Sequence, residues 1–454
     1  MRSEKRILLV EPSFPIPRKS LNHKNFLPIG LLKIASYLKS NGHQVQLVRG
    51  ERAAEDRGFV PDEIWITSLF TYWSKYVRES VRYYRTLYQN AKVIVGGIYA
   101  SLMPEHCRKY TGCDEVYIGL VNEAEKFLPD YSLIDGLNSH PIDYQIVHTS
   151  RGCTRRCVFC GTWKIEPQFT AKETIRTEIK YRRIVFYDNN LLANPNIESV
   201  LSELIELRQK KRIIWCESQS GFDGRLLLEK PHLARLLKKA AFRYPRIAWD
   251  WRYEKYASIQ EQLRILTAGG YSLKDIFVFM LYNWKIPFEE MERKRVKCWK
   301  WGVQIADCRY RPLDQTFDSY HSGKRTQLEG EYYIHRSGGW TDASIRQFRR
   351  NIRRQNICVR HGFPFYSNHF EHKQTSKEVM RKIKSLKTGK EKIGYLDQNH
   401  LSYWLPEKIS DMERESRRYA KPSLVPPVRS GPVQLPLFKD RITESTNRPA
   451  GYRI

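Results

Sequence analysis

The sequence has no run of about 18 apolar residues and no apolar segment near Met1. We therefore expect neither a membrane-spanning helix nor a secretory signal, and we predict a cytoplasmic protein without membrane contact. Cysteine is also sparse, with nine residues in 454, three of them close together. This usage fits a reducing compartment and a metal site better than a disulfide framework.

Acidic residues are few relative to basic ones. The chain has 49 Asp and Glu against 78 Lys and Arg, a formal net charge of +29. Such an excess attracts polyanions, nucleic acid above all, and the attraction should weaken steeply with salt. The alternative is a generally basic, solvated surface that favours solubility.

Three cysteines in one short segment are the most specific signal. Cys153, Cys157 and Cys160 lie in the sequence Ser-Arg-Gly-Cys-Thr-Arg-Arg-Cys-Val-Phe-Cys, after a strand-like run. Three thiolates can hold three irons of a [4Fe–4S] cluster and leave the fourth iron without a protein ligand. A structural zinc site, which would need a fourth Cys or His, and buried unligated thiols are the alternatives. The C-x3-C-x2-C spacing, with an aromatic residue before the last cysteine, resembles that of the radical S-adenosylmethionine (SAM) superfamily.

A second region of the sequence extends this resemblance. Between residues 140 and 320, strand patterns alternate with helical patterns six times, which predicts a parallel sheet. The resemblance implies that this sheet curls into a partial (β/α)6 barrel. Strands are expected at 145–150, 184–187, 212–217, 246–251, 276–282 and 303–308. Helices are expected at 172–181, 196–209, 231–242, 259–268 and 288–301.

Residues 1–135 alternate in a similar way and predict a doubly wound α/β domain, so that the overall fold class is α/β. Its strands are expected at 6–10, 44–48, 63–67, 92–95 and 115–118. The order of Leu27-Pro28-Ile29-Gly30-Leu31, Asn41-Gly42-His43, Gly96-Gly97 and Glu123 with Glu125 resembles the cobalamin-binding domain of many radical SAM enzymes. Paired glycines after a strand allow a backbone to approach a large planar ligand. Because the Asp-x-His-x-x-Gly motif is absent, the domain either holds cobalamin without a protein ligand to cobalt or is a scaffold that binds nothing.

Polar residues at predicted strand ends are the candidate cofactor contacts, since barrel strand ends carry such groups. By resemblance, Asp188 and Asn190 would accept from the SAM amino group. Glu217 and Gln219 lie on the same side of an extended segment and suit ribose or methionyl contacts. Asp250 could accept from ribose hydroxyls and Arg252 could bind the SAM carboxylate. Asn283 and Arg309 are further candidates, and each of these residues has an ordinary strand-end role as its alternative.

The C-terminal part differs from the rest. Residues 321–420 predict a basic, mostly helical extension, and residues 421–454 a Pro-rich, disordered tail. A helix at 340–357 would place Ile345, Phe348 and Ile352 on one face. Arginines on its other face would span successive phosphates of a nucleic acid or form a solvated face: Arg346, Arg349, Arg350, Arg353 and Arg354. In the tail, Gln434, Leu435, Leu437 and Phe438 resemble the peptide by which bacterial replication proteins bind the sliding clamp; docking back on the enzyme is the alternative.

Together these features predict a radical SAM enzyme that uses a [4Fe–4S] cluster and SAM to modify an unactivated centre. The resemblance adds cobalamin-dependent methyl transfer as one possible reaction and flavodoxin or ferredoxin as the expected electron donor. The charge favours nucleic acid as the substrate class. The alternatives are a radical SAM enzyme acting on a small metabolite or peptide, and a nucleic-acid-binding protein whose cluster senses redox state.

Overall fold

The computed structural model describes residues 4–16, 27–56, 58–135, 142–361, 382 and 385–398 and shows a mixed α/β protein built on parallel sheets. The N-terminal region is a five-stranded parallel sheet in the order β2-β1-β3-β4-β5. Its strands are β1 (Arg6–Glu11), β2 (Gln44–Arg49), β3 (Glu63–Ser68), β4 (Lys92–Gly97) and β5 (Glu115–Val116). All five lie where the alternating pattern predicts them, and β5 is shorter than expected because it pairs at only two positions.

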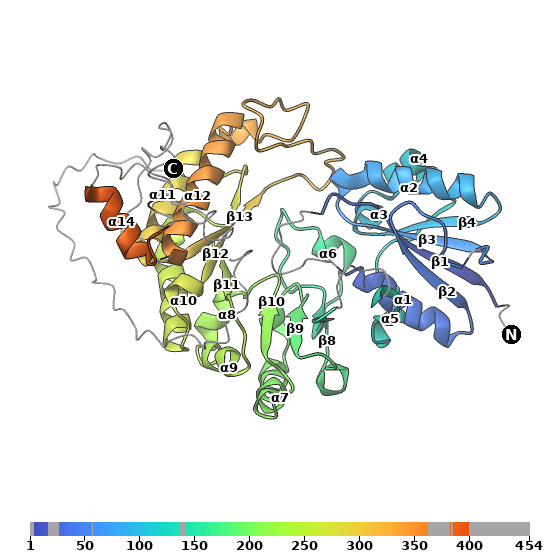
Figure 1. The fold of residues 1–454 in the computed structure, drawn as a ribbon, viewed down its shortest axis with the longest axis horizontal. Helices are drawn as coiled ribbons and strands as arrows, with labels where there is room; N and C mark the ends of the chain where they lie inside the picture. Colours follow the sequence, from blue (N-terminus) through green and yellow to red (C-terminus); the bar gives the residue numbers. More distant parts are fainter. Residues whose placement is uncertain are drawn as a thin grey trace, which may run out of the picture.

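Helices cover both faces of this sheet (Figure 1). They are α1 (Ile29–Ser40), α2 (Ser74–Leu87), α3 (Ile98–Leu102), α4 (Pro104–Thr111) and α5 (Ser132–Asp135), with 3-10 turns η1 (Thr71–Trp73) and η2 (Ala124–Lys126). Side chains from α2 and α4 pack with Leu8 and Val10 on one face, and side chains from α1 pack with Ile7 and Leu9 on the other. Burial on alternate sides of each strand explains why the strands read as continuous apolar runs.

Two three-stranded parallel sheets follow in the chain. One has the order β10-β9-β6, with β6 (Gln145–Val147), β9 (Arg183–Phe186) and β10 (Trp215–Ser218). The other has the order β11-β12-β13, with β11 (Arg246–Ala248), β12 (Phe277–Tyr282) and β13 (Gln304–Arg309). Isolated parallel bridges, Cys216 to Phe242 and Phe222 to Ile247, connect the neighbourhoods of β10 and β11. The six strands predicted for this region are therefore present and parallel.

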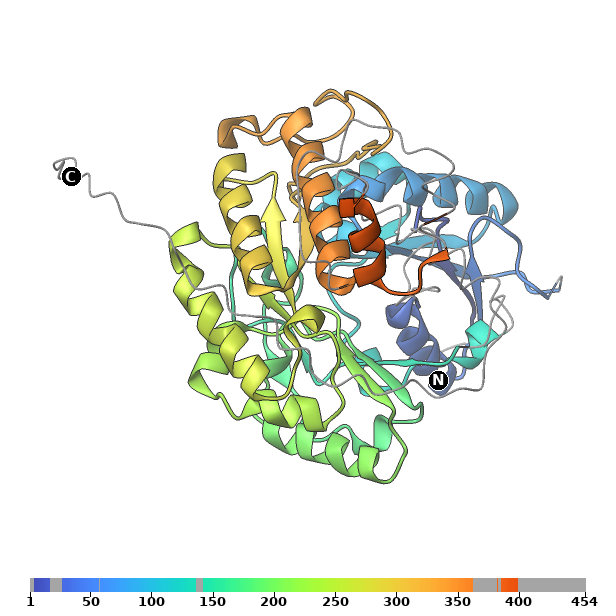
Figure 2. The same ribbon diagram turned by 60° about the vertical axis from the view of Figure 1, so that its left-hand side comes forward.

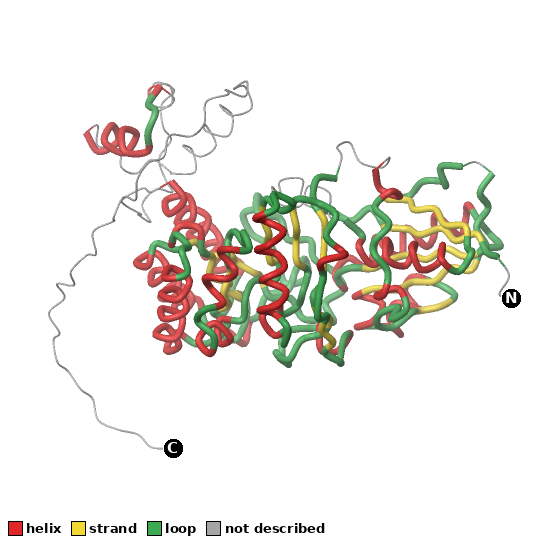
Figure 3. The backbone as a smooth tube through the Cα atoms, turned by 90° about the horizontal axis from the view of Figure 1, so that it is seen from below, coloured by secondary structure: helices red, strands yellow, loops and turns green. Residues whose placement is uncertain are grey.

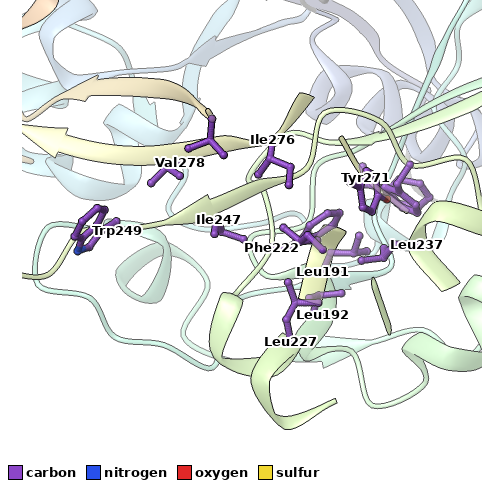
Figure 4. Packing of buried hydrophobic residues seen from close by; sticks show 14 of the residues in the cluster. Leu191, Leu192, Phe222, Leu227, Leu237, Ile247, Trp249, Tyr271, Ile276 and Val278 are labelled. Atoms are coloured by element: carbon purple, nitrogen blue, oxygen red, sulfur yellow. The ribbon is translucent and has the colours of Figure 1, made fainter. Parts of the chain in front are cut away.

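Helices between these strands pack against their outer side. They are α7 (Ile197–Gln209), α8 (Gly224–Glu229), α9 (Leu233–Lys239), α10 (Tyr256–Ala268) and α11 (Phe288–Trp301), joined by 3-10 turns η4 (Leu191–Ala193), η5 (Tyr253–Lys255) and η6 (Leu273–Asp275). One apolar cluster runs from the helices to the strands, and Figure 4 shows Ile247, Trp249 and Val278 among its members. Its continuity across both sheets makes them one packing unit.

One predicted helix of this region is wrong. Residues 172–181 contain only the 3-10 turn η3 (Arg176–Glu178). The Gln145 side chain bonds the end of this segment: Oε1 accepts from the backbone of Lys180 (2.9 Å) and Tyr181 (3.2 Å), and Nε2 donates to Glu178 O (2.6 Å). A buried amide thus replaces the backbone bonds that a helix would have made.

The C-terminal part contains α12 (Asp342–His361), preceded by η7 (Arg336–Gly338), and α14 (Gly389–Gln398). Figure 2 shows α12 alongside α11, and Ile345, Phe348 and Ile352 are buried there as predicted. The five predicted arginines do not share one exposed stripe, because Arg346 and Arg354 are only 7% and 6% exposed. The tail 421–454, with Gln434 to Phe438, lies outside the described residues.

No helix in the described part of the chain is both long and apolar enough to cross a lipid bilayer. Figure 3 shows the five-stranded sheet at one end of the molecule and α12 toward the other, with the two smaller sheets between them.

Candidate metal centre

The three cysteines lie in a loop closed by its own small sheet. Strand β7 (Ser150–Arg151) pairs antiparallel with β8 (Thr170–Ala171), and the segment between them holds the cysteines and α6 (Thr162–Ile165). Gly152 begins this loop with φ +75°, and a Cβ there would lie 2.3 Å from Gln168 O. Only glycine fits this position, so the residue before Cys153 is dictated by the closure of the loop.

The three thiols are half-buried and near one another. Burial raises the pKa of Cys157, and negative charge on Cys160, Asp250 and Cys153 raises it further. The backbone N–H of Arg155 points to Cys153 Sγ (3.4 Å), and the Cys160 thiol donates to Thr162 Oγ1 (3.3 Å). These thiols would have to lose their protons to bind a metal, and a bound cationic centre would then offset the repulsion among the negative charges.

No group of three or more His, Cys, Asp or Glu among the described residues is arranged to hold a metal ion. A zinc ion would need its ligands within about 2.3 Å of one point, and the three thiols are not assembled in that way. Thiolates are ligands of zinc and of iron–sulfur clusters alike. The triad is therefore a candidate metal centre by its residue types and spacing in the sequence.

Glu166 anchors the loop from the inside. Its carboxylate accepts from Arg151 Nη2 (2.9 Å), from the Gly152 backbone N–H (2.7 Å) and from Asn189 Nδ2 (3.2 Å). Asn189 Oδ1 also lies 3.3 Å from Thr162 Oγ1. The segment after β9 thus holds both ends of the cysteine loop, and neither Glu166 nor Asn189 was predicted, because their spacing from the cysteines forms no recognisable pattern.

Asp223 is a second unpredicted anchor. It follows β10, caps α8 by accepting from the Arg225 backbone N–H (3.2 Å), and pairs with Arg155 Nε (2.8 Å) from the cysteine loop. Burial alone would raise the pKa of Asp223, but hydrogen bonds and charge from Arg225 and Arg155 hold it below its usual value. Asn190 Nδ2 also donates to Asp223 (3.3 Å), while the buried Asn190 Oδ1 has no hydrogen-bond partner in the described part of the chain.

The Asp188 carboxylate is bonded to the protein itself. Its side chain is fully buried and accepts from Thr149 N (3.0 Å), Thr149 Oγ1 (2.6 Å) and Ser150 Oγ (2.8 Å). Burial raises the pKa of Asp188 despite these bonds. The carboxylate therefore fixes the strand that leads into the cysteine loop, and this arrangement does not support the predicted contact with the SAM amino group. Asn190, with its orphan oxygen, remains the better candidate acceptor.

Glu217 is likewise committed to the protein. It has no exposed surface and pairs with Arg246 Nη2 (2.6 Å) and Arg243 Nε (3.4 Å). The structure therefore does not support the predicted ribose contact of Glu217. Gln219 is half-buried just beyond β10, with its backbone N–H bonded to Phe186 O (2.9 Å).

Asp250 is the predicted strand-end residue that the fold places within electrostatic range of Cys157. Burial raises the pKa of its carboxyl, and the nearby Lys294 ammonium opposes this rise. Lys294 is itself fully buried and donates to Trp249 O (2.5 Å) and Trp251 O (2.9 Å), and burial lowers its pKa to about 8. Arg252 instead pairs with Glu290 (2.9 Å), an arrangement that does not support its predicted contact with the SAM carboxylate.

The remaining candidates serve the fold. Gly97 has φ +97°, and its position for a Cβ is 2.3 Å from Ser68 O, so this glycine allows β4 to pass close to β3; a Cβ at Gly96 would contact Tyr117 at 3.6 Å. Asn283 bonds Tyr310 O, Tyr333 O and the His335 N–H at 3.1, 2.9 and 2.8 Å. Arg309 pairs with Asp318 (2.5 Å).

The N-terminal region contacts the cysteine loop directly. A Cβ at Gly161, next to Cys160, would lie 3.3 Å from Leu102 of α3 and 3.5 Å from Leu313 after β13. Lys33 of α1 pairs with Glu125 (2.7 Å), which lies 3.6 Å from Arg151. In Figure 1, α6 lies between the five-stranded sheet and β9. The loop is thus held between two parts of the chain.

No protein-family model matches the sequence, and no curated protein matches it either. Among solved structures, a novel cobalamin-binding protein from Desulfitobacterium hafniense DCB-2 is similar over 27% of this chain and 55% of its own, with 16% identity and a TM-score of 0.20. The chain thus spans about half the length of that protein. Similarity at this level carries no argument about function, which has to be argued from the site.

Proposed function

We propose that the protein is a radical SAM enzyme whose cofactor is a [4Fe–4S] cluster held by Cys153, Cys157 and Cys160. The observation that carries the proposal is the half-buried thiol triad, within electrostatic range of Asp250, in a loop closed by β7 and β8. Six parallel strands in two three-stranded sheets support it, and the loop follows the first of these strands. When bound, such a cluster supplies the electron that cleaves the sulfonium C–S bond of SAM.

The chain's own groups suit the binding of SAM around this loop. Asp250 offers a carboxylate within electrostatic range of Cys157, and Asn190 Oδ1 offers a buried acceptor with no partner among the described residues. Glu166 and Asp223 hold the loop that carries the thiolates through their bonds to Gly152 and Arg155. Hydrogen bonds and ion pairs to the residues around metal ligands keep the ligands in a fixed position.

Cobalamin fits the N-terminal region less well. Gly97 is used for the close packing of β4 on β3, whereas a Cβ at Gly96 would make only an ordinary contact with Tyr117 at 3.6 Å. The aromatic rings of Phe70, Tyr72 and Trp73 contact one another after β3. We therefore derive no cobalamin-dependent step. The absorption spectrum of protein purified anaerobically from cells grown with cobalamin tests this, because corrinoid bands would restore the expectation of methyl transfer.

Anaerobic reconstitution with iron and sulfide tests the enzyme directly. We expect about four irons per chain and formation of 5′-deoxyadenosine when SAM and dithionite are added. Cys157→Ala should lose both, whereas Cys298→Ala, which removes a buried thiol of α11, should retain both.

Two results would contradict the proposal. Equal iron content in the Cys157→Ala and Cys298→Ala proteins would show that this loop does not bind the cluster. A full cluster that yields neither 5′-deoxyadenosine nor S-adenosylhomocysteine would favour the redox-sensing protein over an enzyme. A flavodoxin or ferredoxin as electron donor stays a prediction.

A further inference from the structure

A strongly basic pocket lies on the outer side of α12. The cavity measures about 320 Å³ and lies between the loop after Tyr320 and the exposed side of the helix. Among the described residues that line it there is no acid, and the basic ones are Lys324, Arg325, Arg346, Arg349, Arg350 and Arg353. This concentration of positive charge is more local than the +29 of the whole chain and calls for an anionic ligand.

Arg346 builds the pocket. Its guanidinium is 7% exposed and bonds His321 O (3.1 Å), Ser322 O (3.3 Å), Gln327 Oε1 (2.7 Å) and Asp342 (2.8 Å). These bonds fix the loop to the helix, so the pocket is a structured feature. Arg346 therefore has a structural role and is not part of an exposed arginine stripe. The loop adds Lys324 and Arg325 to the pocket, which the helical pattern did not indicate.

Acids near the pocket pair with some of its cations. Glu331 pairs with Lys324 (2.7 Å), Asp342 pairs with Arg346 (2.8 Å), and the half-buried Asp307 lies within electrostatic range of Arg349. Arg349, Arg350 and Arg353 are exposed. Residues 349 and 353 are about 6 Å apart along the helix axis, a spacing suited to neighbouring phosphates of one strand.

An aromatic cluster lies against the cysteine loop. Trp284 contacts Tyr310 (ring centroids 4.0 Å apart) and Phe159 of the cysteine loop (6.2 Å), and Tyr310 contacts Tyr333 (5.8 Å). These rings are all half-buried. The residue before Tyr333, the buried Tyr332, packs against Tyr320 of the basic pocket (5.0 Å). The segment that carries Tyr333 therefore also supports the pocket from inside.

We infer that the basic pocket and the aromatic cluster together bind single-stranded nucleic acid. The arginines hold phosphates of the backbone, and the rings stack on a base next to the cysteine loop. Basic grooves with adjacent aromatic side chains are the usual means of holding single strands, because every base can stack and every phosphate carries charge. The binding stands independently of the proposed enzyme; only modification of the base beside Cys157 rests on that function.

Fluorescence anisotropy with a labelled 15-nucleotide DNA strand tests the inference on the full chain without SAM. We expect the Kd of an Arg349→Gln, Arg350→Gln, Arg353→Gln variant to rise about a hundredfold at 0.1 M salt. The slope of log K against log salt should fall by about 2, since three phosphate contacts are lost. A second variant, Lys324→Gln with Arg325→Gln, should weaken binding in the same direction.

A matched control removes three exposed cations elsewhere, at Lys210, Arg235 and Lys239 near α7 and α9. Its Kd should stay within threefold of that of the native protein. Equal losses in the control and the pocket variant would overturn the inference, because net charge alone would explain binding. Equal affinity for a DNA duplex and for the single strand would also overturn the inference. So would displacement of the strand by millimolar inorganic phosphate, because the pocket would then bind a single small anion. Iron content and 5′-deoxyadenosine formation report separately on the proposed enzyme.

Discussion

The fully buried Asp188 carboxylate gives the sharpest prediction about the cysteine loop. It satisfies three donors, the backbone N–H and hydroxyl of Thr149 and the hydroxyl of Ser150. Thr149 and Ser150 are 0% and 2% exposed, so water cannot replace the carboxylate. A buried N–H left without an acceptor costs about 1–3 kcal/mol. The two hydroxyls also lose an acceptor, but each costs less because it can rotate toward another one. We therefore expect Asp188→Ala to lose about 3 kcal/mol of stability.

Two measurements on this variant separate fold from site. Urea unfolding of the apo protein measures the stability, with exposed Asp314→Ala as a control that should change it by less than about 0.5 kcal/mol. Iron content after reconstitution should fall as well, because the freed strand leads directly to Cys153. Native stability and native iron content in Asp188→Ala would refute the assignment of Asp188 as the residue that positions the loop.

Three further changes test the packing around the site. Arg246→Met should cost about 3–5 kcal/mol in urea unfolding, because it leaves the buried Glu217 carboxylate without its 2.6 Å partner. Gly97→Ala should lower the melting temperature, since the new Cβ would be 2.3 Å from a backbone oxygen at φ +97°, whereas Gly30→Ala, with no atom within 4 Å, should not lower it. Lys294→Met should remove a pH dependence of the stability. The pKa of this lysine is about 8 in the folded protein and 10.5 in the unfolded chain, so the unfolded chain binds more protons between these two pH values. The stability of the native protein should therefore fall by about 3 kcal/mol as the pH falls from 10.5 to 8, and that of the variant should not.

Each of these expectations has a contrary outcome. Unchanged urea midpoints in Arg246→Met would show that Glu217 is not held as an ion pair. Equal melting temperatures for the two alanine variants would remove the steric argument at Gly97. Parallel pH profiles of native protein and Lys294→Met would show that the lysine titrates normally.

The sequence predicted much of the framework because its signals are local. Apolar runs located the strands of all three parallel sheets, and the 3.6-residue pattern located α11 and the buried face of α12. The helix expected at 172–181 failed because Gln145, about 30 residues earlier, bonds that segment in an irregular form. Such a long-range hydrogen bond leaves no periodic trace in the sequence.

By itself the sequence determined that three thiols lie in one loop, since covalent spacing keeps Cys153, Cys157 and Cys160 together in any fold. Only the tertiary structure decided which polar groups face them. It directed Asp188 and Glu217 into buried bonds within the protein and placed Asp250 within electrostatic range of Cys157. It also made Arg346 of α12 a buried link to the neighbouring loop, while Arg349, Arg350 and Arg353 line the pocket. The physical reason is that a buried charge must find a partner wherever the packing places one, and that partner is set by contacts between distant parts of the chain.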